Sequence, residues 1–186
     1  MLPRLPDDPQ AQPPYNMESQ RLTPRCLVVL LLLIWFWSVP AASAARAEGF
    51  DLAVSFGLFD IGQSEKATEA GIEARFASRR IFKLDLVPIV GISANEDGAF
   101  WGYAGFRWEI PLGEKWQLAP TFGTALYEEG DSKDLGHTVE FRSGIEIARR
   151  FPNGRLGLLL YHLSNASISD HNPGEESLLL TWTFGP

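Results

Sequence analysis

The sequence predicts an all-β fold, an eight-stranded antiparallel up-and-down barrel with an apolar outer wall. Three observations predict it. From Phe50 onward, apolar and polar residues alternate with the two-residue period of a β-strand. The alternation recurs in eight segments separated by turn-forming residues, and eight strands close into a barrel whose interior just holds side chains. In each segment one face is bulky and apolar, whereas the other mixes glycine, small residues and charges.

Residues 1–47 have the layout of a secretory signal rather than of the barrel. A basic stretch begins at Met17, a possible start, and an apolar run follows from Cys26 to Val39. Small residues then offer a cleavage site near 44–47. The alternative is an anchor helix, but the run is shorter than the roughly 20 residues that such a helix needs. We therefore expect a signal region at 1–47 and a barrel at 48–186.

Composition excludes several classes of function. The chain of 186 residues carries a net charge of −7, which argues against a nucleic-acid partner. The single cysteine, Cys26, lies in the signal region. Disulfides and thiolate metal or redox sites are therefore excluded for the barrel.

Each of the eight segments contributes one bulky face. In chain order, these faces are formed by Phe50, Leu52, Val54, Phe56 and Leu58; Ala70, Ile72, Ala74 and Phe76; Phe82, Leu84, Leu86 and Val90; Phe100, Ala104, Phe106, Trp108 and Ile110; Trp116, Leu118, Phe122 and Leu126; Val139, Phe141, Ile145 and Ile147; Leu156, Leu158 and Leu160; and Leu178, Leu180, Trp182 and Phe184. The opposite faces carry charges two residues apart, which we expect to pair in the interior: Glu73/Arg75, Lys83/Asp85, Arg107/Glu109 and Glu140/Arg142.

The bulky faces are expected to lie outside, against lipid, as in the outer membrane of a Gram-negative bacterium. Closure then leaves no unpaired strand edge in hydrocarbon. The alternative is a soluble periplasmic barrel that binds a small lipid and keeps its bulky face inside. The expected connections also alternate in length: short at 77–80, 111–114 and 152–154, and longer at 60–68, 92–98, 127–137 and 166–175. Longer loops are typical of the extracellular end.

Polar residues interrupt the bulky faces on both sides of the 166–175 connection. His162 and Ser164 share the bulky face of the seventh segment, and Glu176 shares that of the eighth. A hairpin centred near residue 169 brings Glu176 opposite His162, one strand spacing away. Such residues are costly on a lipid-facing wall unless they have a function. Together they form a Ser-His-Glu set, in which histidine takes the serine proton and glutamate orients the imidazole. The alternative is a group of interfacial residues that only solvate the barrel rim.

At these residues the chain resembles the lipid A 3-O-deacylase family, the PagL-type outer-membrane enzymes. The resembling motif is His162-x-Ser164-Asn165-Ala166, followed by Asn172-x-Gly174 and by Glu176, twelve residues after the serine. The resemblance implies an eight-stranded barrel that removes the ester-linked 3-hydroxyacyl chain at the 3-position of lipid A.

The resemblance also implies roles for individual residues. Ser164 is expected to be the nucleophile, His162 the general base and Glu176 its orienting acid, with no metal or other cofactor. Three further residues in matching positions are expected to position the triad or bind the oxyanion: Asn165, Asn172 and Gly174. Glu175 should point to the opposite face, and the loop residues Asp170 and His171 should be exposed.

A hydrolytic site that opens sideways into the outer leaflet meets acyl chains first. Lipid A of lipopolysaccharide is therefore the expected substrate. A phospholipase remains open, because the triad specifies ester chemistry rather than a head group. A different class of function also remains open: a non-catalytic eight-stranded barrel with a structural or adhesion role. A surface that is apolar all round is compatible with a homodimer.

Overall fold

The computed structural model describes residues 49–62 and 66–184. The predicted signal region lies outside the described residues. The described part contains ten strands: β1 (Asp51–Phe59), β2 (Ala67–Arg75), β3 (Arg79–Ile81), β4 (Leu84–Asn95), β5 (Phe100–Trp108), β6 (Ile110–Leu112), β7 (Trp116–Glu128), β8 (Val139–Phe151), β9 (Gly154–Ser164) and β10 (Glu175–Phe184). None of the described residues belongs to a helix with the length and apolarity to cross a membrane.

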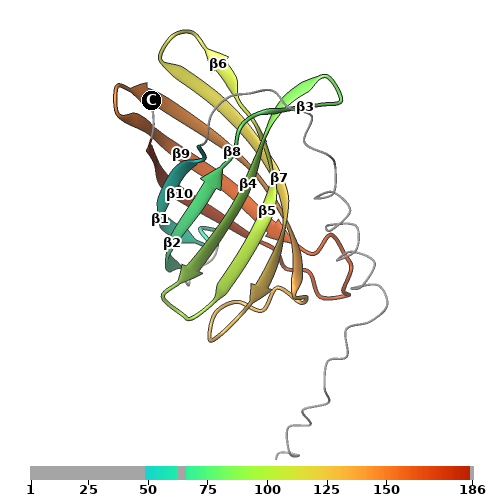
Figure 1. The fold of residues 1–186 in the computed structure, drawn as a ribbon. Coiled ribbons are helices and arrows are strands. Elements are labelled where there is room, and N and C mark those ends of the chain that lie inside the picture. Colours follow the sequence, from blue (N-terminus) through green and yellow to red (C-terminus); the bar gives the residue numbers. More distant parts are fainter. Residues whose placement is uncertain (1–48, 63–65, 185–186) are drawn as a thin grey trace, which may run out of the picture. The chain divides into compact units, whose positions relative to one another are not determined.

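Eight of these strands form a closed antiparallel ring, and the short strands β3 and β6 extend it at one end (Figure 1). The ring runs β1-β2-β4-β5-β7-β8-β9-β10 and returns to β1, because β10 pairs with β1 and β2 pairs with β4. β3 continues from β2 beside β4, and β6 continues from β5 beside β7. The predicted eight-stranded antiparallel barrel is confirmed.

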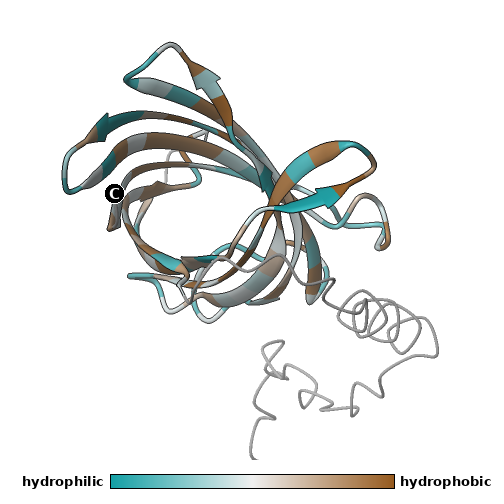
Figure 2. Cartoon of the chain, turned by 45° about the horizontal axis from the view of Figure 1, so that its top comes forward, coloured by the Kyte–Doolittle hydropathy of each residue, from teal (hydrophilic) through white to brown (hydrophobic). Residues whose placement is uncertain are grey.

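The bulky faces lie on the outer wall. Phe56, Phe122 and Leu180 are 62%, 61% and 58% exposed. Hydrophilic and hydrophobic residues alternate along the strands in Figure 2. The alternative of a barrel with its bulky face inside is therefore wrong, and the outer wall is of the kind that suits lipid.

Buried ion pairs fill the middle of the barrel. Glu146 accepts from Arg75 and from Arg107, each at 2.8 Å. The predicted pairs Glu73/Arg75 and Arg107/Glu109 are present at 2.7 and 3.2 Å. Buried charges are stable only when they are paired and hydrogen-bonded. The pairs of Glu146 with Arg75 and Arg107 meet this requirement and link strands on different sides of the barrel.

The expected pair Glu140/Arg142 is wrong. The Arg142 guanidinium lies between two aromatic rings, 4.4 Å from the centroid of Tyr103 and 4.1 Å from that of Tyr161. Cation–π contacts therefore take the place of a carboxylate. Glu140 is fully buried, and its carboxylate oxygens have no hydrogen-bond partner within the described residues.

The expected turn at 77–80 is also wrong. The chain turns instead at Phe82 and Lys83, between β3 and β4, with positive φ at both residues (47° and 68°). Positive φ at both central positions matches the twist of a two-residue hairpin. Phe82 is consequently 91% exposed at the hairpin tip. Lys83 and Asp85 are exposed too and form no interior pair.

The expected long connection at 92–98 is short. β4 continues to Asn95 and β5 begins at Phe100. The Asn95 side chain accepts from the Ala99 backbone N–H at 2.9 Å and so closes the tight turn. The connections that follow β1, β7 and β9 are longer and begin at this same end of the barrel.

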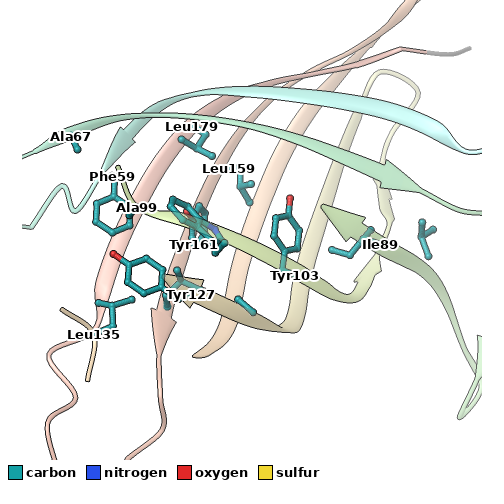
Figure 3. Packing of buried hydrophobic residues seen from close by; sticks show 14 residues of the cluster. Phe59, Ala67, Ile89, Ala99, Tyr103, Tyr127, Leu135, Leu159, Tyr161 and Leu179 are labelled. Carbon is teal, nitrogen blue, oxygen red and sulfur yellow. The ribbon is translucent and has the colours of Figure 1, made fainter. Parts of the chain in front are cut away.

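A buried aromatic cluster closes the interior toward the end with the longer connections (Figure 3). Phe59 lies 5.5 Å from Trp101 and 6.5 Å from Tyr127 between ring centroids. Leu135, from the 129–138 connection, and Leu163, from β9, complete the buried contacts. The strand ends that carry His162 and Glu176 therefore rest on a packed interior.

Candidate active site

The pairing of β9 with β10 brings two predicted site residues face to face. His162 and Glu176 are direct partners in the ladder. Glu176 Oε1 lies 3.1 Å from His162 Nδ1, and the two side chains are 51% and 40% exposed. The register expected from a hairpin centred near residue 169 is thus confirmed, and both side chains are on the outer wall.

Ser164 is the last residue of β9 and lies on the same face as His162, two residues along the strand. On the neighbouring strand β8, Phe141 is the ladder partner of Ser164. Because Nδ1 of His162 faces Glu176, Nε2 is the nitrogen left to serve the serine. Among the described residues no hydrogen bond joins Ser164 Oγ to the imidazole. Catalytic hydrogen bonds often tighten only once a substrate is bound.

Gly174 makes room for the imidazole. Its φ is +61°, a conformation that favours glycine. A Cβ built at this position would lie 2.7 Å from His162 Cε1 and 3.3 Å from Nε2. The predicted positioning residue therefore lies directly against the histidine ring.

Asn165 joins two loops beneath the site. It is fully buried, and its Nδ2 donates to the backbone carbonyls of Leu135 at 2.8 Å and His171 at 2.9 Å. Its backbone N–H donates to Asn172 Oδ1 at 3.0 Å. The Asn165 Nδ2 group is thus occupied by loop contacts, while its buried Oδ1 has no hydrogen-bond partner within the described residues. The same contacts leave the Nδ2 group of Asn172 unused.

Glu175, which precedes Glu176 in the sequence, lies in a different environment. Glu175 is fully buried inside the barrel and accepts from Ser177 Oγ at 2.9 Å. This confirms that it points away from Glu176. In the loop, Asp170 and His171 are exposed, as expected.

Two contacts of Glu176 were not expected from the sequence. The backbone N–H of Ile61 donates to the Glu176 carbonyl at 2.8 Å. A Cβ at Gly62 would lie 3.3 Å from Glu176 Oε2. A glycine after a strand is an ordinary turn signal, and only the closure of β1 onto β10 brings it to the carboxylate.

An apolar groove begins below the site on the outer wall. It has a volume of about 320 Å³ and is lined by Phe56, Gly57, Leu58, Thr68, Leu158, Leu178 and Leu180. Leu178 follows Glu176 by two residues and shares its face of β10. The groove therefore starts within one strand repeat of the polar cluster.

The connection between β7 and β8 forms an ion pair with the end of β1. Lys133 Nζ lies 2.8 Å from Asp60 Oδ2, at the end of β1. Within the described ranges, no group of three or more His, Cys, Asp or Glu side chains is arranged to hold a metal ion.

Comparison with known proteins decides the family. The model of the lipid A 3-O-deacylase (PagL) family matches residues 90–184, just over half of the chain. The chain belongs to this family. The matched range contains all six predicted site residues, whereas β1 and β2 precede it.

Two members of the PagL family are similar to the chain. The lipid A deacylase PagL of Bordetella bronchiseptica is 30% identical over 114 residues, which cover 55% of this chain and 63% of that protein. The chain thus matches less than two thirds of that relative's length. The crystal structure of the outer membrane enzyme PagL superposes with a TM-score of 0.59 at 19% identity and covers 73% of this chain and 99% of that one. This likeness shows that the two proteins share the barrel fold.

Proposed function

We propose that this protein is an outer-membrane esterase that removes the ester-linked 3-hydroxyacyl chain at the 3-position of lipid A. The observation that carries the proposal is the contact between His162 and Glu176 on an apolar outer wall, with Ser164 on the same face of β9. Membership of the lipid A 3-O-deacylase family supports the choice of substrate.

In the proposed mechanism, Ser164 Oγ attacks the ester carbonyl carbon while His162 Nε2 takes the hydroxyl proton. The tetrahedral intermediate collapses, the C–O bond to the sugar breaks, and His162 returns the proton to the leaving sugar oxygen. A water molecule, deprotonated by His162, then attacks the acyl carbonyl. The bond to Ser164 Oγ breaks, His162 returns the proton to Oγ, and the 3-hydroxy fatty acid is released. Glu176 holds the proton on Nδ1, which keeps Nε2 able to accept.

The oxyanion needs donors beside Ser164. Asn172 suits this role because its Oδ1 is held by the Asn165 backbone, which orients the remaining Nδ2 group. Ala166 and Ser167 follow the nucleophile with φ of 51° and 61°. Two successive residues of this conformation form a turn, and its backbone N–H groups are further candidate donors to the oxyanion. Asn165 contributes indirectly, by holding together the two loops that its side chain joins.

The apolar groove explains why a long acyl chain would be accepted. From Glu176 to Leu180 the strand rises about 14 Å at a typical 3.4 Å per residue, and the groove follows this part of β10. An ester bond at the triad would thus leave its acyl chain along the outer wall. The longer connections at the same end support a site at the outer leaflet, because longer loops are typical of the extracellular end and lipopolysaccharide is found in that leaflet.

The mass spectrum of extracted lipid A tests the proposal. Gram-negative cells that produce the wild-type protein should yield lipid A lacking one 3-hydroxyacyl group, and cells that produce Ser164→Ala should yield unmodified lipid A. Accumulation of lysophospholipids with intact lipid A would instead indicate a phospholipase. Unchanged lipids with both proteins would support the non-catalytic barrel and overturn the proposal.

A further inference from the structure

We propose that the turn after β1, residues 60–62, is a positioning element that holds Glu176 against His162. The inference rests on the proposed function, in which Glu176 orients the histidine. It assigns a role to a segment that precedes the range matched by the family model.

The turn contacts Glu176 at both its backbone and its carboxylate. The Ile61 N–H donates to the Glu176 carbonyl at 2.8 Å, which extends the pairing of β1 with β10 beyond the ladder. A Cβ at Gly62 would lie 3.3 Å from Glu176 Oε2, while Oε1 lies 3.1 Å from His162 Nδ1. The carboxylate is therefore bounded by the imidazole on one oxygen and by the turn on the other.

The turn itself is anchored from inside the barrel. Asp60 is 4% exposed and has a φ of 54°, a conformation that aspartate tolerates better than most residues. Its N–H donates to Glu175 Oε2 at 3.4 Å, and its Oδ2 lies 2.8 Å from Lys133 Nζ. The position of the turn is thus set by the 129–138 connection and by β10 together.

Gly62 leaves space beside the Glu176 carboxylate, and its backbone conformation does not itself call for glycine. Its φ lies outside the left-handed region, so other residues could adopt the same conformation. A larger side chain there would push against Glu176 Oε2. Because about half of the Glu176 side chain is exposed, the carboxylate can move away, and it would then leave His162. Displacements of about 1 Å at a positioning group can cost up to about 100-fold in rate.

The experiment compares purified wild type, Gly62→Ala, Gly62→Val, Glu176→Ala and the double variant Gly62→Val/Glu176→Ala on lipopolysaccharide. Gly49→Val is the matched control, because Gly49 precedes β1 at the opposite end and no atom lies within 4 Å of its Cβ position. Heat-modifiable gel mobility verifies that each variant forms a barrel.

We expect Gly62→Val to lower kcat by about 10-fold or more, with KM within about twofold, and Gly62→Ala to have a smaller effect. Gly49→Val should match wild type. In the Glu176→Ala background, Gly62→Val should cause no further loss, because residues that act as a unit are non-additive. If Gly62→Val does not form a barrel, Lys133→Met, which removes the anchor of Asp60, replaces it and should show the same pattern.

Two results would overturn the inference alone: an active wild type with an unaffected Gly62→Val, or the same loss from Gly62→Val with and without Glu176. A wild type that hydrolyses no lipopolysaccharide would instead overturn the proposed function, and this inference with it.

Discussion

Glu176 lies directly opposite His162 in the β9–β10 ladder, and its Oε1 is 3.1 Å from His162 Nδ1. The contact is therefore fixed by backbone register rather than by two long side chains that happen to meet. A shift of one residue in the register would turn one partner into the barrel interior. The proposed chemistry thus depends on the strand pairing as well as on the residues.

Covalent labelling should report an activated serine. A fluorophosphonate probe should add one phosphonyl group to Ser164 in the wild-type barrel, because the neighbouring histidine removes the hydroxyl proton. His162→Ala should label at least about 100-fold more slowly. Intact-protein mass spectrometry with peptide mapping measures this. Equal labelling of both proteins would show that His162 does not activate Ser164.

Loss of the Glu176 charge should lower kcat and should affect kcat more strongly than KM. Glu176→Gln keeps the shape of the side chain but does not stabilise the imidazolium, so kcat should fall by roughly 10-fold to 10,000-fold. Asp170→Asn, in the exposed part of the adjoining loop, is the matched control and should retain wild-type rates. The measurement is steady-state release of fatty acid from lipopolysaccharide. Equal losses from both substitutions would argue for a general effect of loop charge.

The two asparagines should separate into a chemical and a structural role. Asn172→Ala should lower kcat by about 100-fold, the usual loss when an oxyanion donor is removed, and should lower the melting temperature less than Asn165→Ala, because it removes one hydrogen bond rather than two. Asn165→Ala removes two buried hydrogen bonds to loop carbonyls and should cost about 1–3 kcal/mol of stability. Thermal unfolding in detergent and kinetics on the same samples distinguish them. The opposite assignment would follow if Asn165→Ala were fully stable but inactive.

Gly174 should not tolerate a side chain, because of the histidine rather than because of strain. Gly174 and Gly113 have φ of +61° and +70°, but a Cβ at Gly113 meets no atom within 4 Å. Alanine therefore brings similar backbone strain at both sites, and only Gly174→Ala clashes with His162. We expect Gly174→Ala to be inactive and Gly113→Ala to retain activity in the same esterase assay. Similar activities of the two variants would contradict the packing argument.

The apolar groove should select for long acyl chains. Leu180→Trp fills part of the groove and should lower kcat/KM for dodecanoyl p-nitrophenyl esters more than for butyryl esters. Leu156→Trp is the matched control, since Leu156 is exposed on the same wall of β9 but does not line the groove. An equal effect of Leu180→Trp on both esters would show that the groove does not bind the acyl chain of the substrate.

The faces of the strands could be predicted because a barrel wall between a polar interior and an apolar surrounding imposes the two-residue period on every strand. Phe56 and Leu180 follow this rule, since both side chains are exposed on the outer wall. The β3–β4 turn could not be predicted, because positive φ at Phe82 and Lys83 is uncommon for such residues. The preceding polar stretch carried the stronger turn signal.

The candidate site was predictable where it is local. His162 and Glu176 belong to one hairpin, so parity and spacing sufficed to predict their contact, and Ser164 lies on the same face of β9 as His162. The role of Gly62 was hidden, because β1 reaches β10 only through closure of the whole barrel. Likewise, Asn165 bonds to a different loop, at Leu135, a contact that no spacing along the chain reveals.

The most direct test of the central claim is the release of 3-hydroxy fatty acid from purified lipopolysaccharide by the refolded barrel, with Ser164→Ala compared side by side. The account predicts time-dependent release of one 3-hydroxyacyl group per lipid A by the wild-type protein and no release above background by Ser164→Ala. Release at the wild-type rate by Ser164→Ala, or no release by a correctly folded wild type, would contradict it.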